Sequence, residues 1–272
     1  MDAREPHLPD EPATGIAGFA ADLAGCLRFF SRLPVPAFAG GDPAAMPDFS
    51  RAARALSLAG LILAAPAALC LFLLGLTNLP PLLIAALTLA MLAAATGALH
   101  EDGLADMADG FGGGRETERV LAIMKDSRIG SFGAVALVLS LAARLAGIAT
   151  LVQASPAWGA LALLAAAAMS RASMAWIWYA LPAIRSDGAS HAAGRPDRPA
   201  FYLNLAIGAV LTLLLVVPGF GLSAALLAFA LALAAAVALG AYAMRRIGGQ
   251  TGDVLGAGQQ VAEVAFFIGL LI

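Results

Sequence analysis

Charge is scarce in this sequence: only 12% of its 272 residues are Asp, Glu, Lys or Arg, whereas 61% are hydrophobic. Soluble domains carry about 25% charged residues, so the composition excludes an ordinary soluble protein. The apolar residues form long runs separated by short charged stretches, which is typical of a protein that crosses a membrane several times. We therefore predict an all-α fold, a polytopic transmembrane helical bundle.

Cysteines are few, and the N-terminal residues do not have the basic character of a signal peptide. The two cysteines, Cys26 and Cys70, have no metal-like spacing, and we expect packing residues without a disulfide. Residues 1–15 are acidic and contain proline, the opposite of the basic start of a signal peptide. We predict that 1–15 form a disordered tail and that 16–272 form a single membrane-embedded domain.

The apolar runs predict six to seven spans. Residues 16–33 are too polar to span easily, and we expect an N-terminal helix at the membrane interface. The final run, 259–272, is short and would span only if its helix began earlier, near Leu255. The six runs long enough to cross about 30 Å are 55–76, 79–99, 133–152, 157–181, 202–220 and 222–244.

The positions of Lys and Arg predict the orientation. Outside the spans they occur only before residue 55 and in 100–132, 182–200 and 245–258. The connections at 77–78, at 153–156 and around residue 221 carry no charge. All charged loops therefore fall on one side, which the positive-inside rule makes the cytoplasmic side.

The stretch from His100 to Gly114, HEDGLADMADGFGGG, contains the densest group of acids. A helix advances about 100° per residue, so the directions of Asp102, Asp106 and Asp109 around the helix axis fall within roughly 60° of one another. The three acids therefore share one helical face. Carboxylates grouped in this way suit a hard divalent cation. The alternative is a solvated acidic helix end. We expect the helix to extend the second span, and a helix C-terminus disfavours acids, which favours the metal site.

The loop after the acidic stretch adds groups that suit phosphate. Glycines 110 and 112–114 are expected to stop the helix. Their turn either presents backbone N–H groups to phosphate or is only a flexible helix stop. Residues 116–124 are expected to form a short surface helix. Lys125 and Arg128 follow, and cations beside a bound metal fit a diphosphate. The alternative is a basic patch touching anionic lipid headgroups.

Three charged residues lie within apolar runs. Arg144 and Arg171 need partners there, because an intramembrane charge is costly. Glu263 is the acid expected at comparable depth, so we predict that it pairs with one of them, either as a structural ion pair or beside a substrate phosphate. In the glycine-rich stretch 248–258, Asp253 is a candidate fourth carboxylate or base.

These motifs together resemble the cobalamin synthase family, also called adenosylcobinamide-GDP ribazoletransferases. The resemblance covers residues 22–272. Glu101 is not a fixed part of the family pattern, and 182–200 matches it poorly, so neither is assigned to the site. The matching segments are RLPVP at 32–36, DGLADMADG at 102–110, IMKDSRIG at 123–130 with Gly133, and GGQTGDVLGA at 248–257 followed by Glu263.

The resemblance implies a Mg²⁺-dependent enzyme in the inner membrane of a prokaryote. Adenosylcobinamide-GDP and α-ribazole, or its 5′-phosphate, would yield adenosylcobalamin, or its 5′-phosphate, and GMP. We expect a lipid bilayer around the protein and no nucleic-acid partner; a homo-oligomer or a complex with other cobalamin-pathway enzymes stays open. We predict catalytic roles for Asp106, Asp126, Arg128 and Asp253, metal ligation by Asp102, Asp106 and Asp109, and substrate binding by His100, Lys125, Arg128, Arg171, Gln250, Thr251 and Glu263.

Two alternatives are weaker. A CDP-alcohol phosphotransferase or a prenyltransferase would also carry Asp-rich metal motifs, but the Ala-Arg of the former and the second Asp-rich motif of the latter are missing from the sequence. A cation transporter would place its acids near the middle of the bilayer, whereas we expect these acids at its edge.

Overall fold

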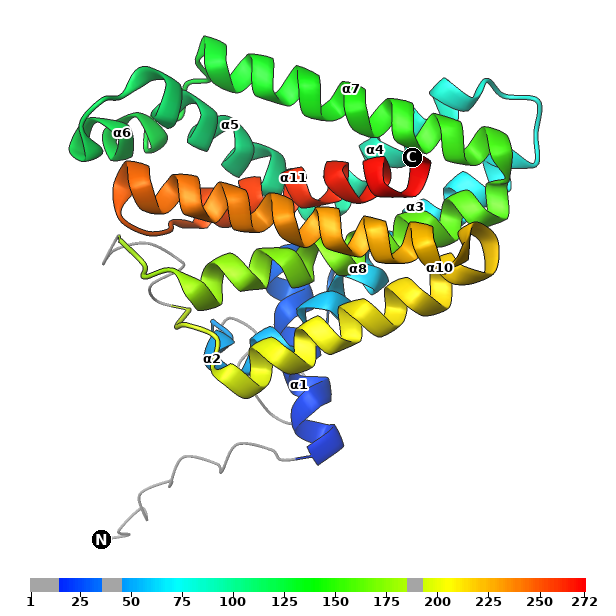
Figure 1. Cartoon of the computed structure of the whole chain (residues 1–272), viewed down its shortest axis with the longest axis horizontal. Coiled ribbons are helices and arrows are strands. Elements are labelled where there is room, and N and C mark those ends of the chain that lie inside the picture. Colours follow the sequence, from blue (N-terminus) through cyan, green and yellow to red (C-terminus); the bar gives the residue numbers. More distant parts are fainter. Residues whose placement is uncertain (1–14, 36–45, 185–192) are drawn as a thin grey trace, which may run out of the picture.

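The computed structural model describes residues 15–35, 46–184 and 193–272, and these residues form a helical bundle (Figure 1). The described ranges contain no strand, only an isolated bridge between Ala183 and Gln250. The all-α class is therefore confirmed. The helices are α1 Gly15–Phe30, α2 Phe49–Ala52, the short 3-10 helix Ala53–Ala55, α3 Leu56–Gly75, α4 Pro81–Thr96, α5 Leu99–Gly113, α6 Thr117–Met124, α7 Ser131–Ala154, α8 Pro156–Ala180, α10 Arg198–Ile247 and α11 Gly252–Leu271.

Helix α8 lies at the centre of the bundle and contacts α3, α7, α10 and α11. Its residues Ala165–Ala168 are all buried. Small residues let helix backbones approach closely in a membrane, where lipid offers no hydrophobic driving force between helices. The approach is closest at Gly60 of α3, where an added Cβ would collide with the carbonyl oxygen of Ala167.

The multi-span character of the bundle is confirmed. Five helices are long and apolar enough to cross a membrane, and the bent pair α4 and α5 would make a sixth. Helix α10 is itself two helices joined at Gly221, where φ is 85°, and the chain turns back there (Figure 1). Counting each half separately gives six or seven crossings, as the apolar runs predict. The last helix begins at Gly252, slightly before Leu255, and its 20 residues suffice to span.

The acidic helix does not extend the second span, and this prediction is wrong. Helix α4 ends at Thr96, and Gly97 and Ala98 both adopt left-handed conformations, with φ of 65° and 56°. The chain then turns by 89° into α5. A left-handed glycine is a common helix stop. The lone Gly97 lies inside an apolar run, so hydropathy alone does not reveal the turn.

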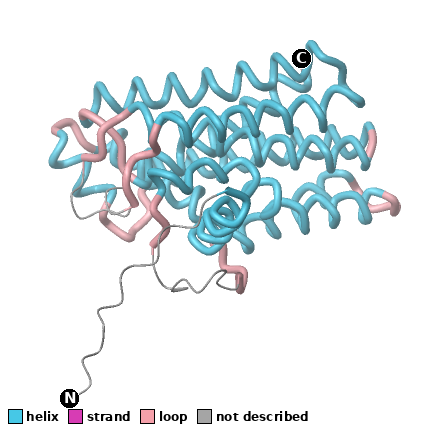
Figure 2. Tube along the Cα trace, turned by 90° about the horizontal axis from the view of Figure 1, so that it is seen from below, coloured by secondary structure: helices cyan, strands magenta, loops and turns pink. Residues whose placement is uncertain are grey.

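The charged connections meet at one end of the bundle. The backbone of Gln250 pairs with Pro182 and Ile184, and Thr117 Oγ1 donates to the carbonyl of Arg246 at 3.4 Å. Irregular segments are concentrated at this end, whereas short turns close the other (Figure 2). The grouping of Lys and Arg in the sequence therefore identifies loops that are close together in space.

Helix α1 runs across the direction of the spanning helices (Figure 1). Its buried Asp22 pairs with Arg51 at 3.0 Å and Arg54 at 2.6 Å, which fixes α1 to the start of the first span. Both cysteines are free thiols, as expected. Of the predicted disordered tail, residues 1–14 lie outside the described residues, and Gly15 begins α1.

Candidate active site

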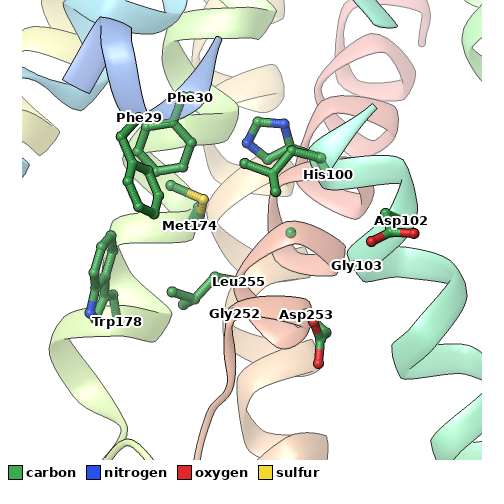
Figure 3. Close-up of a pocket in the computed structure, with 12 residues that line it drawn as sticks. Phe29, Phe30, His100, Asp102, Gly103, Met174, Trp178, Gly252, Asp253 and Leu255 are labelled. Atoms are coloured by element: carbon green, nitrogen blue, oxygen red, sulfur yellow. The ribbon is translucent and has the colours of Figure 1, made fainter. Parts of the chain in front are cut away.

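The acidic helix α5 crosses the start of α11 at two glycines. An added Cβ at Gly103 would lie 2.9 Å from the carbonyl oxygen of Asp253, and one at Gly256 would lie 3.3 Å from the Cα of His100. Only glycine permits backbones to approach this closely. The crossing brings Asp102 and Asp253, 151 positions apart in the sequence, to the rim of one cavity (Figure 3).

This first cavity has a volume of about 180 Å³. Phe29, Phe30 and Trp178 form part of its wall, and His100 lies beside Phe30 (Figure 3). The two carboxylates at the rim are its acidic groups. The cavity thus combines an aromatic wall with a charged edge.

A second hollow, of about 440 Å³, lies along α5. Its lining includes three carboxylates, Glu101, Asp102 and Asp106, and also Arg32 and Ser127. Asp102 lines both hollows. An acid-lined hollow with an arginine at its edge can hold a cation together with a phosphate.

Asp109 does not face this hollow. Its Oδ2 accepts the N–H of Gly130 at 2.7 Å and its Oδ1 accepts that of Gly133 at 2.8 Å. It is 8% exposed, and an added Cβ on either glycine would collide with its carboxylate. Asp109 therefore holds the N-terminus of α7, where a helix dipole favours a negative charge.

The structure does not bring the three predicted metal ligands together. Among the described residues, no group of three His, Cys, Asp or Glu side chains is arranged to hold a metal ion. The helical spacing of the three acids is as predicted, but the neighbouring loop uses Asp109 for backbone hydrogen bonds. Asp102 and Asp106 remain on the acidic hollow. They suit Mg²⁺, which usually takes one or two protein carboxylates and completes its shell with phosphate and water.

The first two acids of α5 also lie at the opposite helix end from the one expected. Glu101 and Asp102 occupy the first turn of α5, because the chain bends ahead of them. Acids are favourable at a helix N-terminus, so their presence there needs no cation. The hollow that Glu101, Asp102 and Asp106 share is the feature that suits a cation. Gly110 and Gly112 are also helical, since α5 continues to Gly113, so the predicted stop falls at the end of the glycine run.

The charged side chains of the basic loop, Lys125, Asp126 and Arg128, line neither hollow. Lys125 is exposed, and Arg128 forms an ion pair with Asp126 at 2.6 Å. Hydrogen bonds from Arg128 lower the pKa of Asp126 to about 2, and the carboxylate raises the pKa of Arg128. An acid of such low pKa accepts a proton poorly near neutral pH. Ser127 is the member of this loop that lines the acidic hollow.

A buried polar network stands behind the acidic hollow. Arg144 pairs with Glu263 at 3.0 Å, which confirms the predicted pairing, and also with Glu101 at 2.9 Å. Gln260 accepts from Arg144 at 3.0 Å and donates to Glu101 at 3.1 Å. The sequence prediction omitted Glu101, because an acid next to a motif gives no sign that it faces inward.

The remaining predicted residues lie near the crossing in different environments. Arg171 is buried and donates to the carbonyl of Ala167 at 3.1 Å; it forms no ion pair with a described carboxylate. Thr251 caps α11 by accepting from Val254 N at 3.4 Å, and its hydroxyl donates to Asp253 at 3.3 Å. Gln250 is 1% exposed. These three residues thus support the site from within the protein.

Comparison with known proteins agrees with the motifs. The family model described as cobalamin-5-phosphate synthase matches residues 22–271. An adenosylcobinamide-GDP ribazoletransferase of Azorhizobium caulinodans is 50% identical over 255 residues, covering 93% of this chain and 96% of that protein. Proteins of the same name from Sinorhizobium medicae and Rhizobium etli are 47% and 44% identical, each over at least 92% of this chain and 96% of the relative. No solved structure matches.

Proposed function

The chain belongs to the cobalamin-5-phosphate synthase family, and from this premise we propose that it transfers the cobinamide-phosphate group of adenosylcobinamide-GDP to α-ribazole or α-ribazole 5′-phosphate. The products are adenosylcobalamin, or its 5′-phosphate, and GMP. This is the late step of nucleotide-loop assembly in cobalamin biosynthesis. The shared name of the relatives favours this reaction over the CDP-alcohol phosphotransferase, prenyltransferase and transporter alternatives.

The observation that carries the assignment of the site is the position of Asp102 between two hollows. One hollow adds Asp106 and Glu101, and the other adds Asp253. Two substrates that meet at one phosphorus atom need two adjoining compartments. We assign the diphosphate to the acidic hollow and the acceptor nucleoside to the aromatic cavity.

Asp102 and Asp106 are the residues that would hold Mg²⁺ on the diphosphate. When bound, the ion neutralises phosphate oxygens and so favours departure of GMP. Arg32 lies on the same hollow and would donate to further phosphate oxygens. Asp109, Lys125 and the Asp126–Arg128 pair lie outside this arrangement, so the proposal gives them no contact with the metal.

Asp253 is the proposed base. The attacking group is a ribose hydroxyl of the ribazole other than the 5′-hydroxyl, because the 5′-oxygen of α-ribazole 5′-phosphate keeps its phosphate in the product. This hydroxyl attacks the phosphorus next to the cobinamide, the bond from that phosphorus to the GMP oxygen breaks, and the proton of the attacking hydroxyl passes to Asp253. GMP leaves with the electron pair of the broken bond. Phosphoryl transfer requires positioning and charge neutralisation more than covalent chemistry by the protein.

We place the site at the cytoplasmic face of the inner membrane. The apolar helices indicate a multi-pass membrane protein, and the relatives are bacterial. The segments around the crossing of α5 and α11 contain exposed cations at Arg115, Arg119, Lys125, Arg128 and Arg245. Loops rich in Lys and Arg stay in the cytoplasm.

The test is an assay of purified protein with adenosylcobinamide-GDP, α-ribazole and Mg²⁺. GMP should form in equal amount to adenosylcobalamin, and only when both substrates are present. Replacement of Mg²⁺ by a chelator should stop GMP formation. Verified substrates that yield no GMP with folded protein would refute the reaction.

A further inference from the structure

The aromatic cavity beside Asp102 and Asp253 has a chemical character of its own. Beyond the two carboxylates at its rim, its side chains are Phe29, Phe30, Leu99, Met174, Trp178 and Leu255, with His100 among them (Figure 3). Four helices, α1, α5, α8 and α11, supply this wall. A wall of this kind selects a flat apolar ring over a charged or sugar-like group.

Within this wall, His100 has a ring nitrogen, Nε2, with no hydrogen-bond partner among the described residues. The side chain is 3% exposed. The ring lies nearly parallel to that of Phe30, with an angle of 8° and centroids 5.8 Å apart. A buried polar atom without a partner is costly, so such an atom beside a cavity indicates a ligand group that satisfies it.

We propose, on the basis of the proposed function, that this cavity is the subsite for the benzimidazole base of α-ribazole. The base is a flat, apolar two-ring system with one free ring nitrogen. His100 in its neutral form donates from Nε2 to that nitrogen, and Phe30 and Trp178 contact the ring faces and edge. The sugar then extends towards the rim, where Asp253 meets the attacking ribose hydroxyl.

The other reactants fit the cavity less well. The corrin ring system is several times larger than a cavity of about 180 Å³. Guanine carries a row of hydrogen-bonding groups along its edge, and buried polar groups left unpaired weaken binding. Apart from His100, the inner wall offers hydrocarbon, aromatic rings and the thioether of Met174. The cavity therefore suits the acceptor nucleoside.

The first experiment compares Michaelis constants in enzyme that releases GMP. Phe30→Leu and His100→Leu should each raise the KM for α-ribazole roughly tenfold, the size expected for one lost stacking contact or hydrogen bond. The KM for adenosylcobinamide-GDP should stay unchanged. The control is Phe220→Leu, the same replacement at the opposite end of the bundle, beside Gly221, where neither constant should change (Figure 1).

The second experiment measures binding directly. Replacing Trp158 and Trp176 by Phe leaves Trp178 as the one tryptophan of the three in the sequence. Its fluorescence should be quenched saturably by α-ribazole in the absence of the other substrate, and by free dimethylbenzimidazole at higher concentration. GMP should not quench it.

The outcomes separate the subsite from the reaction. Wild-type protein that releases no GMP from verified substrates refutes the proposed function. An active wild type whose Phe30→Leu and His100→Leu variants keep their α-ribazole KM refutes the subsite alone. Quenching of Trp178 by GMP, or a selective rise in the KM for adenosylcobinamide-GDP, would assign the cavity to guanine and equally overturn the proposal.

Discussion

The guanidinium of Arg144 on α7 lies 2.9 Å from the carboxylate of Glu101 on α5. The same arginine reaches Glu263 on α11 at 3.0 Å, so one buried cation joins three helices. Glu101 precedes Asp102 in the chain, and its ion pair therefore fixes the turn that presents Asp102 to both hollows. The stability of this network and the geometry of the site depend on each other.

Removal of the central cation should destabilise the fold. Arg144→Leu leaves the buried Glu263 and the half-buried Glu101 without their partner, and breaking a buried pair costs about 3–5 kcal/mol. The apparent melting temperature in detergent should fall by several degrees or more. The control is Arg245→Leu, an exposed arginine on α10, which should melt like the wild type. An unchanged melting temperature for Arg144→Leu would contradict the network.

Loss of a proposed metal ligand should impair activity without unfolding. Asp106→Asn keeps the shape of the side chain and removes a charge from the acidic hollow. We expect GMP release to fall by about two to three orders of magnitude, the usual effect of losing one stabilising group in a transition state. Melting should stay near that of the wild type. The control is Glu118→Gln, which likewise replaces an acid by its amide, at an exposed position of α6. Normal turnover by Asp106→Asn would remove Asp106 from the site.

Asp109→Asn should behave in the opposite way. Asparagine offers one acceptor oxygen where the carboxylate serves both Gly130 and Gly133, so one buried N–H loses its partner. The expected cost is about 1–3 kcal/mol of stability. The Mg²⁺ concentration that gives half-maximal activity should not change. A large shift in that concentration with unchanged melting would restore Asp109 as a ligand.

The Asp126–Arg128 pair makes a prediction about pH. The pKa of Asp126 is depressed to about 2, so its contribution is fully present above the ordinary carboxyl value of 3.8 and is lost only as the pH falls through about 2. Asp126 therefore stays ionised across the range in which the enzyme can be assayed. The pH profile of GMP release by Asp126→Asn should match that of the wild type between about pH 5 and pH 9, roughly the range in which proteins are stable. Loss of a limb of that profile would identify Asp126 as the base.

The glycine crossing can be tested by one added carbon. Gly103→Ala places a Cβ 2.9 Å from the carbonyl oxygen of Asp253, and backbone cannot yield as a flexible side chain can. The helices must separate, so activity should fall by at least about tenfold, because small displacements of reacting groups are costly. Gly113→Ala is the control: its Cβ would meet only the end of Ile123, at 3.3 Å. Equal activity of the two variants would contradict the role of the crossing.

Composition and the positions of charge predict much of this molecule. Apolar runs determine where helices cross a membrane, because length and hydropathy decide this locally. The pairing of Glu263 with an intramembrane arginine follows from the free-energy cost of burying an unpaired charge in the membrane, since a charge in that environment requires a partner. The meeting of the charged loops at one end follows from the alternation of the spans.

The side-chain environments are a different matter. Asp102, Asp106 and Asp109 are the same residue type and share one helical face, so the sequence does not distinguish them. The difference comes from the neighbouring backbone, because the N–H groups of Gly130 and Gly133 make Asp109 a helix cap. The sequence does not reveal that the helix breaks at Gly97 and that α5 begins after it. Nor does it reveal that Glu101 pairs with Arg144, which lies 43 positions away.

The sequence by itself determined the class of fold, the family and the set of acids from which the site is built, because these depend on local composition and on motifs. Only the tertiary structure decided which acids share a hollow, because helices α5 and α11 meet through two glycines far apart in the chain. That contact places Asp102 between an acidic and an aromatic compartment. No local pattern specifies such an arrangement, since it depends on how distant backbones pack.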